Sequence, residues 1–180
     1  MPLRIGQPMD HDFTEPLGLL SDCHRRIEQF LDVLVRLAQS ASQPLTPERW
    51  GELQKALSYF DKAAPRHTAD EEESLFPRLR ATRDPSAAQA LECLSQLERD
   101  HEMTAAHHRA VDRFCRHWLD HGFLSDVDMR NLRDRLAELQ AIYHEHIAIE
   151  DDQVFPAAAR LLSDRQLAEI GREMQERRSV

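Results

Sequence analysis

The chain has 180 residues, of which 41% are hydrophobic, 31% charged and 6% aromatic, and it contains only 5 glycines. This length and mix are typical of one compact domain and exclude a disordered tail. Because β-sandwiches and barrels need many turn and aromatic residues, the composition favours an all-α fold. The formal net charge of −9 disfavours binding to phosphate backbones, so nucleic acid is not expected as a partner.

Membrane insertion and secretion are not expected either. No apolar run approaches the roughly 18 residues that a membrane span needs, and Met1 to Asp10 lack the apolar core of a secretory signal. The cysteines Cys23, Cys93 and Cys115 are widely spaced and form no Cys-x-x-Cys motif. This pattern favours reduced thiols and a cytoplasmic location.

Caps and helix breakers predict five helices in chain order. The predicted segments are approximately 15–40, 47–80, 87–121, 126–162 and 164–178. N-caps are predicted at Thr46 and Ser163, a kink at Pro65 and a left-handed cap at Gly122. Residues 1–14 are expected to form an N-terminal arm and residues 15–162 a helical bundle. Residues 163–180 are expected to form a helix that packs on the bundle or extends it.

The four long segments carry apolar residues at alternating steps of three and four, which is typical of helices that pack nearly parallel. We therefore predict an antiparallel up-down four-helix bundle with an additional short C-terminal helix. Each apolar stripe also carries a histidine, and two stripes carry a glutamate. Because a buried carboxylate costs several kcal/mol unless it is paired or metal-bound, a cation is expected between these glutamates.

The pattern His-x-x-x-Glu-x-x-x-x-Phe-Pro occurs twice, over residues 67–77 and 146–156. His24 precedes the first copy by 43 residues and His101 precedes the second by 45, so a helical hairpin is used twice. A single His-x-x-x-Glu is weak evidence for a site. The repeated Phe-Pro in the same register makes the combined signal strong.

Residues four apart lie on one face of a helix, so a histidine and a glutamate at this spacing can bind one metal from the same side. Two such helices supply carboxylates that can bridge two ions, and histidines from the other two helices complete the site. Four imidazoles with two carboxylates suit iron or another first-row metal. The predicted metal ligands are His24, His67, Glu71, His101, His146 and Glu150.

From His24 to Pro156 these motifs resemble the hemerythrin-like, or HHE cation-binding, domain family. The resemblance implies two non-haem iron ions in a four-helix bundle, bridged by two carboxylates and by an oxo or hydroxo group. It further implies that His24 and His67 bind one iron and that His101 and His146 bind the other. In the same way it implies that Glu71 and Glu150 are the bridges.

The sequence departs from the oxygen-carrying members at two positions. Ala105 stands where those carriers have a further histidine, which would leave coordination positions open on the irons. Asp151 follows Glu150 directly and is the alternative second bridge, although the internal repeat favours Glu150. Both departures favour the bacterial sensor-like and iron-centre repair members over a pure oxygen carrier.

Three further residues have open roles. Glu28 follows His24 by four residues and is either an ordinary flanking carboxylate, an extra ligand or a hydrogen-bond partner of a ligand. Tyr143 is either plain core or a hydrogen-bond donor to a ligand. His108 lies about 10 Å beyond His101 along its helix, too far for the same metal, so a structural role is favoured over a role in a channel or beside a ligand. Cys23 is expected to point away from the apolar stripe.

The leading functional hypothesis is a di-iron protein that binds or reacts with oxygen, nitric oxide or peroxide, for sensing, scavenging or iron-centre repair. A redox or iron–sulfur protein would then be a partner. One alternative is a di-iron peroxidase or oxidase, and another is an interaction module held together by zinc or a single ion. No nucleophile pattern or phosphate-binding glycine loop is present, which favours a metal-binding or redox protein over a turnover enzyme.

Overall fold

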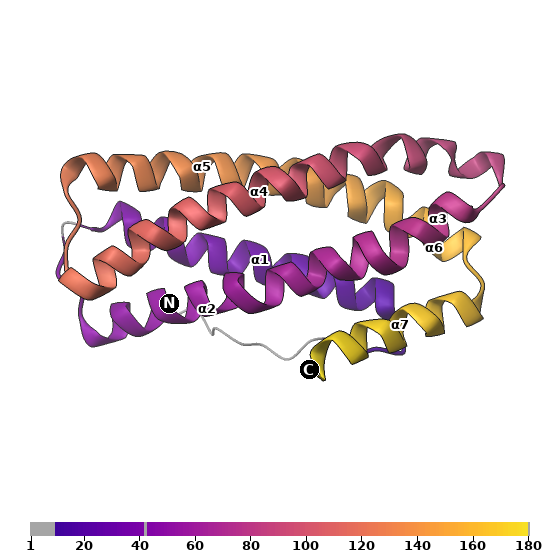
Figure 1. Cartoon of the computed structure of the whole chain (residues 1–180), viewed down its shortest axis with the longest axis horizontal. Coiled ribbons are helices and arrows are strands. Elements are labelled where there is room, and N and C mark those ends of the chain that lie inside the picture. The colour runs from indigo at the N-terminus through magenta and orange to yellow at the C-terminus, as the bar shows by residue number, and fades with distance from the viewer. Residues whose placement is uncertain (1–9, 42, 180) are drawn as a thin grey trace.

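The computed structural model describes residues 10–41 and 43–179. Every regular element of this described part is helical, which confirms the predicted all-α class. Figure 1 shows four long helices lying side by side along the long axis of the molecule. These are α1 (Pro16–Gln39), α2 (Pro47–Ala69), α4 (Ala88–His121) and α5 (Asp126–Ile149). Among the described residues, no helix is both long enough and apolar enough to cross a membrane.

Shorter elements extend this framework at one end. The π-helical turn η1 (Asp70–Leu75) joins α2 to α3 (Phe76–Ala81), and a second π-helical turn, η3 (Glu150–Val154), joins α5 to α6 (Phe155–Leu161). A 3-10 turn, η2 (Pro85–Ala87), precedes α4. The last helix, α7 (Asp164–Arg178), lies against the outside of this end (Figure 1).

The predicted caps account for where the helices begin and end. The Thr46 side chain accepts a hydrogen bond from the Arg49 N–H, and Ser163 forms a capping box with Gln166. Gly122 ends α4 in the left-handed region at φ 77°, where glycine avoids the steric cost of a Cβ atom. Pro65 lies inside α2, which continues to Ala69.

The two π-helical turns were not predicted, since both segments were expected to continue as plain α-helix. In each turn, the N–H of the phenylalanine donates to the carbonyl of the glutamate five residues earlier: Phe76 to Glu71 and Phe155 to Glu150. The following residue is a proline, which has no N–H and would clash with the carbonyl four residues before it. Widening the turn relieves that clash, so the repeated Phe-Pro is the sequence signal for both turns.

The described end of the N-terminal arm packs on the helices. The backbone N–H of His11 donates to Asp22 Oδ2 at 2.8 Å. Its ring lies so close to Gly18 that an added Cβ there would come within 2.5 Å of the ring. The carbonyl oxygen of Phe13 approaches Gly171 on α7 in the same way, at 1.9 Å from such a Cβ. The rest of the predicted arm, residues 1–9, lies outside the described residues.

Two apolar clusters fill the interior. The larger cluster lies among the four long helices and contains Trp118 and Cys115. The smaller one contains Phe76 and Phe155 and also receives side chains of α7. On α1, His24 lies between Leu20 of the smaller cluster and Ile27 of the larger one. The polar residues of the apolar stripes therefore lie where the two apolar clusters meet.

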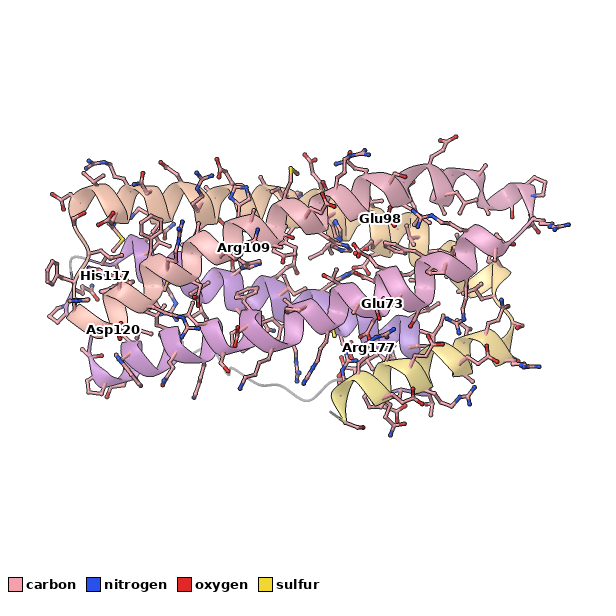
Figure 2. The ribbon with its side chains drawn as sticks, viewed as in Figure 1. Glu73, Glu98, Arg109, His117, Asp120 and Arg177 are labelled. Atoms are coloured by element: carbon pink, nitrogen blue, oxygen red, sulfur yellow. The ribbon has the colours of Figure 1, made fainter. Side chains whose placement is uncertain are left out.

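Helix α7 is attached through a buried carboxylate. Asp70 is fully buried, and its two oxygens accept hydrogen bonds from Arg177 Nη1 at 2.9 Å and Arg178 Nη2 at 2.6 Å. Arg177 also contacts Glu73 and Ser74 of η1, and Figure 2 shows it beside Glu73. The negative charge that these arginines neutralise therefore lies on η1 and not on their own helix.

This attachment makes the arginines important for stability. Replacing both, as Arg177→Gln with Arg178→Gln, leaves Asp70 buried without a partner and should lower the free energy of unfolding by about 3–5 kcal/mol. Urea denaturation followed by circular dichroism measures the change. The matched control is Arg80→Gln, which breaks an exposed pair with Glu98 and should cost at most about 1 kcal/mol. Equal losses in the two proteins would contradict a special role for Asp70.

Candidate metal centre

Six buried side chains from four helical segments meet at the junction of the two apolar clusters. Glu71 and Glu150 are fully buried, Glu71 at the second position of η1 and Glu150 at the first position of η3. The Nε2 atom of each histidine faces a carboxylate. These nitrogen–oxygen distances are 3.0 Å for His24–Glu150, 3.2 Å for His67–Glu71, 3.3 Å for His101–Glu71 and 3.1 Å for His146–Glu150.

The six residues form two overlapping groups whose ligand atoms lie within 4.8 Å of one another. One group contains the pair His24 and His67, the other contains the pair His101 and His146, and Glu71 and Glu150 belong to both. The structure thus brings together all six residues singled out in the sequence. Each group offers two imidazole nitrogens and two carboxylates, and can hold a metal cation.

The cluster is short of hydrogen-bond donors and of positive charge. Both oxygens of Glu71, both oxygens of Glu150 and the Nε2 atoms of His24 and His101 are buried without a hydrogen-bond partner of good geometry. Such unsatisfied groups are rare in protein interiors and costly when charged. A cation between the carboxylates would satisfy all of these atoms at once, so the donor set fits a metal site.

The pKa shifts in the cluster have the same cause. Burial alone would raise the pKa of Glu71, but the neighbouring histidines His67, His101 and His24 hold it well below its usual value. Burial alone would lower the pKa of His101, but Glu71 and Glu72 raise it to about 9. For His67 burial prevails and lowers the pKa. The carboxylates therefore draw positive charge toward themselves, a charge that a bound metal ion would supply.

The outer nitrogens of two histidines form hydrogen bonds with further carboxylates. His24 Nδ1 lies 3.2 Å from Asp151 and His101 Nδ1 lies 2.7 Å from Glu72. Because an ionised carboxylate only accepts hydrogen bonds, these two Nδ1 atoms must carry the proton. The lone pair of Nε2 then points into the cluster, as metal binding requires.

These contacts separate the roles of Glu150 and Asp151. Glu150 lies inside the cluster, whereas Asp151 accepts hydrogen bonds from His24 and from Ser21 at its edge. Glu72 follows Glu71 as Asp151 follows Glu150, and it likewise contacts the outer nitrogen of a histidine, that of His101. Sequence reasoning did not identify Glu72 or Asp100 as partners of specific histidines. The signal was available, since each directly adjoins a predicted ligand.

The other two histidines lack such a hydrogen bond. Among the described residues, neither His67 Nδ1 nor His146 Nδ1 has a hydrogen-bond partner, although Asp100 lies 3.5 Å from His146 Nδ1. Asp100, the residue near His146, directly precedes His101 in the sequence. Its counterpart in the first half of the repeat, directly before His24, is Cys23. Cys23 is only 6% exposed but belongs to neither apolar cluster. Burial raises the pKa of its thiol, which keeps the sulfur protonated.

The phenylalanines of the two Phe-Pro pairs cover the cluster. The ring of Phe155 stacks on His24 with a centroid distance of 5.3 Å, and that of Phe76 lies parallel to His101 at 6.4 Å. Both phenylalanines are buried, so they fix the imidazoles and keep water from that side. Each copy of the repeated motif therefore supplies a histidine and a glutamate that can bind metal, a widened helical turn, and a phenylalanine that packs on a histidine of the other copy's hairpin.

The three residues with open roles are placed differently. Glu28 is exposed on α1 and takes no part in either group, which rules against its alternative as an extra ligand. Tyr143 is buried, and its hydroxyl lies 2.9 Å from His108 Nε2. Neither residue belongs to the two groups of ligand atoms, and both line a neighbouring groove.

Comparison with known proteins agrees with this geometry. The model of the hemerythrin HHE cation-binding domain matches residues 15–158. The chain belongs to the hemerythrin HHE cation-binding domain family. It is also 29% identical over 169 residues to an uncharacterized protein of Haemophilus influenzae, which covers 93% of this chain and 92% of the relative. All six clustered residues fall within the matched hemerythrin region, and α7 lies beyond it.

The carboxylates behind the histidines should tune metal affinity. Asp151→Ala and Glu72→Ala each remove the acceptor that orients an imidazole, and each should weaken ferrous-ion binding about 10- to 100-fold. Competition with a chelator of known affinity measures this change, while circular dichroism checks that the helices remain. Asp152→Ala is the matched control, since this neighbouring carboxylate is exposed. An Asp151→Ala affinity equal to that of the control would show that the contact with His24 is irrelevant to the metal.

Proposed function

We propose that this hemerythrin-like protein is a di-iron protein, built on four antiparallel helices, that binds or reacts with a small ligand such as oxygen, nitric oxide or peroxide. Its role would be sensing, scavenging or iron-centre repair. The observation that carries the proposal is the sharing of Glu71 and Glu150 by two groups, each with its own histidine pair. A site for one ion would not need two such pairs.

The donor types support iron in particular. Each ion would receive two imidazole nitrogens and oxygens from both carboxylates, with no thiolate in either group. Imidazole and carboxylate ligands suit iron, whereas structural zinc sites commonly use cysteine and close all four positions. Iron held here would supply reversible redox chemistry and open coordination positions for a small ligand.

The surroundings support binding of a small ligand over turnover of a large substrate. The four histidines line a cavity of only about 10 Å³, together with apolar side chains such as Ile27 and Ile147. That volume corresponds to about one water molecule. The protein's own contribution would be to orient the imidazoles, hold the bridging carboxylates and exclude bulk water.

Elemental analysis of anaerobically purified protein tests the proposal. The expected result is two irons per chain in the wild type and loss of iron in Glu71→Ala and Glu150→Ala, because each variant removes a ligand shared by both ions. Zinc, a single ion, or no metal after reconstitution with ferrous iron would contradict the proposal and favour a structural module.

Matched controls lie on the same helix. Glu145→Ala and His144→Ala change exposed residues of α5 close to the cluster in sequence and should retain both irons. His146→Ala, two residues from His144, should lose iron because it removes an imidazole that faces Glu150. If all of these variants lose iron alike, the loss reflects helix damage and not ligand removal.

A further inference from the structure

A groove between α2 and α4 leads to the histidines. It has a volume of about 780 Å³, and its walls include Phe60, His108 and Ala105. Four residues line both this groove and the small cavity beside the histidines: Ala64, Thr68, His101 and Tyr143. The groove and the cavity therefore adjoin, and Tyr143 stands where they meet. Arg109 of α4 lies at the groove's rim (Figure 2).

The cavity lies on one side of the cluster. Its lining includes all four histidines but neither Glu71 nor Glu150. Ala64 and Tyr143 each lie three residues before a histidine of the cluster, which places them about one turn from that histidine and about two turns from the carboxylates along the chain. The space beside Tyr143 is thus the side of the histidines that the bridging carboxylates leave free.

Three positions on this side are apolar in the first half of the internal repeat and polar in the second, whereas Thr68 of the first half corresponds to Ile147 of the second. Ile27, Leu31 and Ala64 in the first half are buried and apolar. The positions that correspond to them in the second half hold polar residues. These are, in the same order, Thr104, His108 and Tyr143. The polar side chains therefore gather at the half that contains His101 and His146.

Hydrogen bonds connect these polar residues. His108 Nε2 lies 2.9 Å from the Tyr143 hydroxyl, and Phe60 stacks on the His108 ring at 4.3 Å. The Thr104 hydroxyl donates to the His101 carbonyl at 3.0 Å, so its proton is already used. Burial lowers the pKa of His108 to about 4 and raises that of Tyr143, which keeps both groups neutral.

A neutral imidazole and a phenol can share their hydrogen bond in two ways. Either the hydroxyl donates to Nε2, or Nε2–H donates to the phenol oxygen. In the second arrangement the hydroxyl proton is free to point into the cavity. A ligand that accepts a hydrogen bond there would favour this arrangement, and no change in net charge is needed.

We propose that the α2–α4 groove is the route by which a small uncharged ligand, such as dioxygen or nitric oxide, reaches the His101–His146 half of the centre, where the Tyr143 hydroxyl, held by His108, donates a hydrogen bond to it. This inference rests on the proposed metal centre. It distinguishes the two metal positions, because the residue that corresponds to Tyr143 in the other half is Ala64, which carries no donor. Tyr143 is the residue that touches the ligand, and His108 positions it.

Stopped-flow binding of nitric oxide to the ferrous protein tests the role of Tyr143. Tyr143→Phe keeps the ring but removes the donor, so the dissociation rate should rise about three- to tenfold while the association rate stays unchanged. The iron content of this variant should equal that of the wild type. Loss of iron from a folded Tyr143→Phe protein would make Tyr143 a metal ligand and overturn the inference.

The route is tested at an exposed position. Ala105 is exposed on α4 and lines the groove but not the inner cavity, so Ala105→Trp should narrow the groove without disturbing the histidines. Association and dissociation should slow by the same factor and leave the affinity unchanged. The reason is that a narrower groove raises the barrier to entry and to exit equally, without changing the free energy of the bound ligand. The control Ala141→Trp, on the exposed face of α5, should leave both rates as they are.

A third measurement needs no ligand binding. In zinc-loaded protein, the ¹⁵N NMR signals of the His108 ring report its hydrogen bond to Tyr143, and Tyr143→Phe should shift them while leaving the other ring signals in place. Wild-type ferrous protein that binds neither nitric oxide nor oxygen and does not react with peroxide would overturn the proposed function. Wild-type binding with unchanged rates in Tyr143→Phe and Ala105→Trp would overturn this inference and leave the proposed function standing.

Discussion

The arrangement of this protein depends on two glutamates buried side by side among four histidines. Carboxylates in a protein interior are tolerated when they are paired or bind metal. Here both oxygens of Glu71 and of Glu150 lack a hydrogen-bond partner of good geometry, although both side chains are fully buried. The rest of the fold presents these four oxygens to four imidazole nitrogens. A cation is the missing component that makes the cluster energetically reasonable.

The local backbone serves that purpose. Both glutamates lie in the first two residues of a π-helical turn, and each turn is followed by a Phe-Pro pair. The proline of each pair would clash with the preceding turn of a regular α-helix. The phenylalanine then covers a histidine from another helix. The next residue after each glutamate, Glu72 or Asp151, holds the outer nitrogen of a histidine on the other hairpin. A short repeated motif therefore builds ligand, turn, cover and support together.

The sequence predicted the elements whose causes are local. Caps such as Thr46 and Gly122 set helix ends through their own hydrogen bonds and conformations, and the histidine and glutamate spacing identified the residues that meet. The π-helical turns were missed because helical periodicity was expected to continue through the prolines. The attachment of Arg177 and Arg178 to Asp70 was missed because it links residues more than 100 positions apart. Pairing across such distances depends on how helices pack, which one sequence does not reveal.

The central claim is that two metal ions occupy this cluster and share its two carboxylates. Anomalous X-ray diffraction at the iron edge, from crystals grown with ferrous iron, tests it most directly. The account predicts two peaks, one beside His24 and His67 and the other beside His101 and His146, with Glu71 and Glu150 reaching both. A single peak, or peaks away from these six residues, would contradict it.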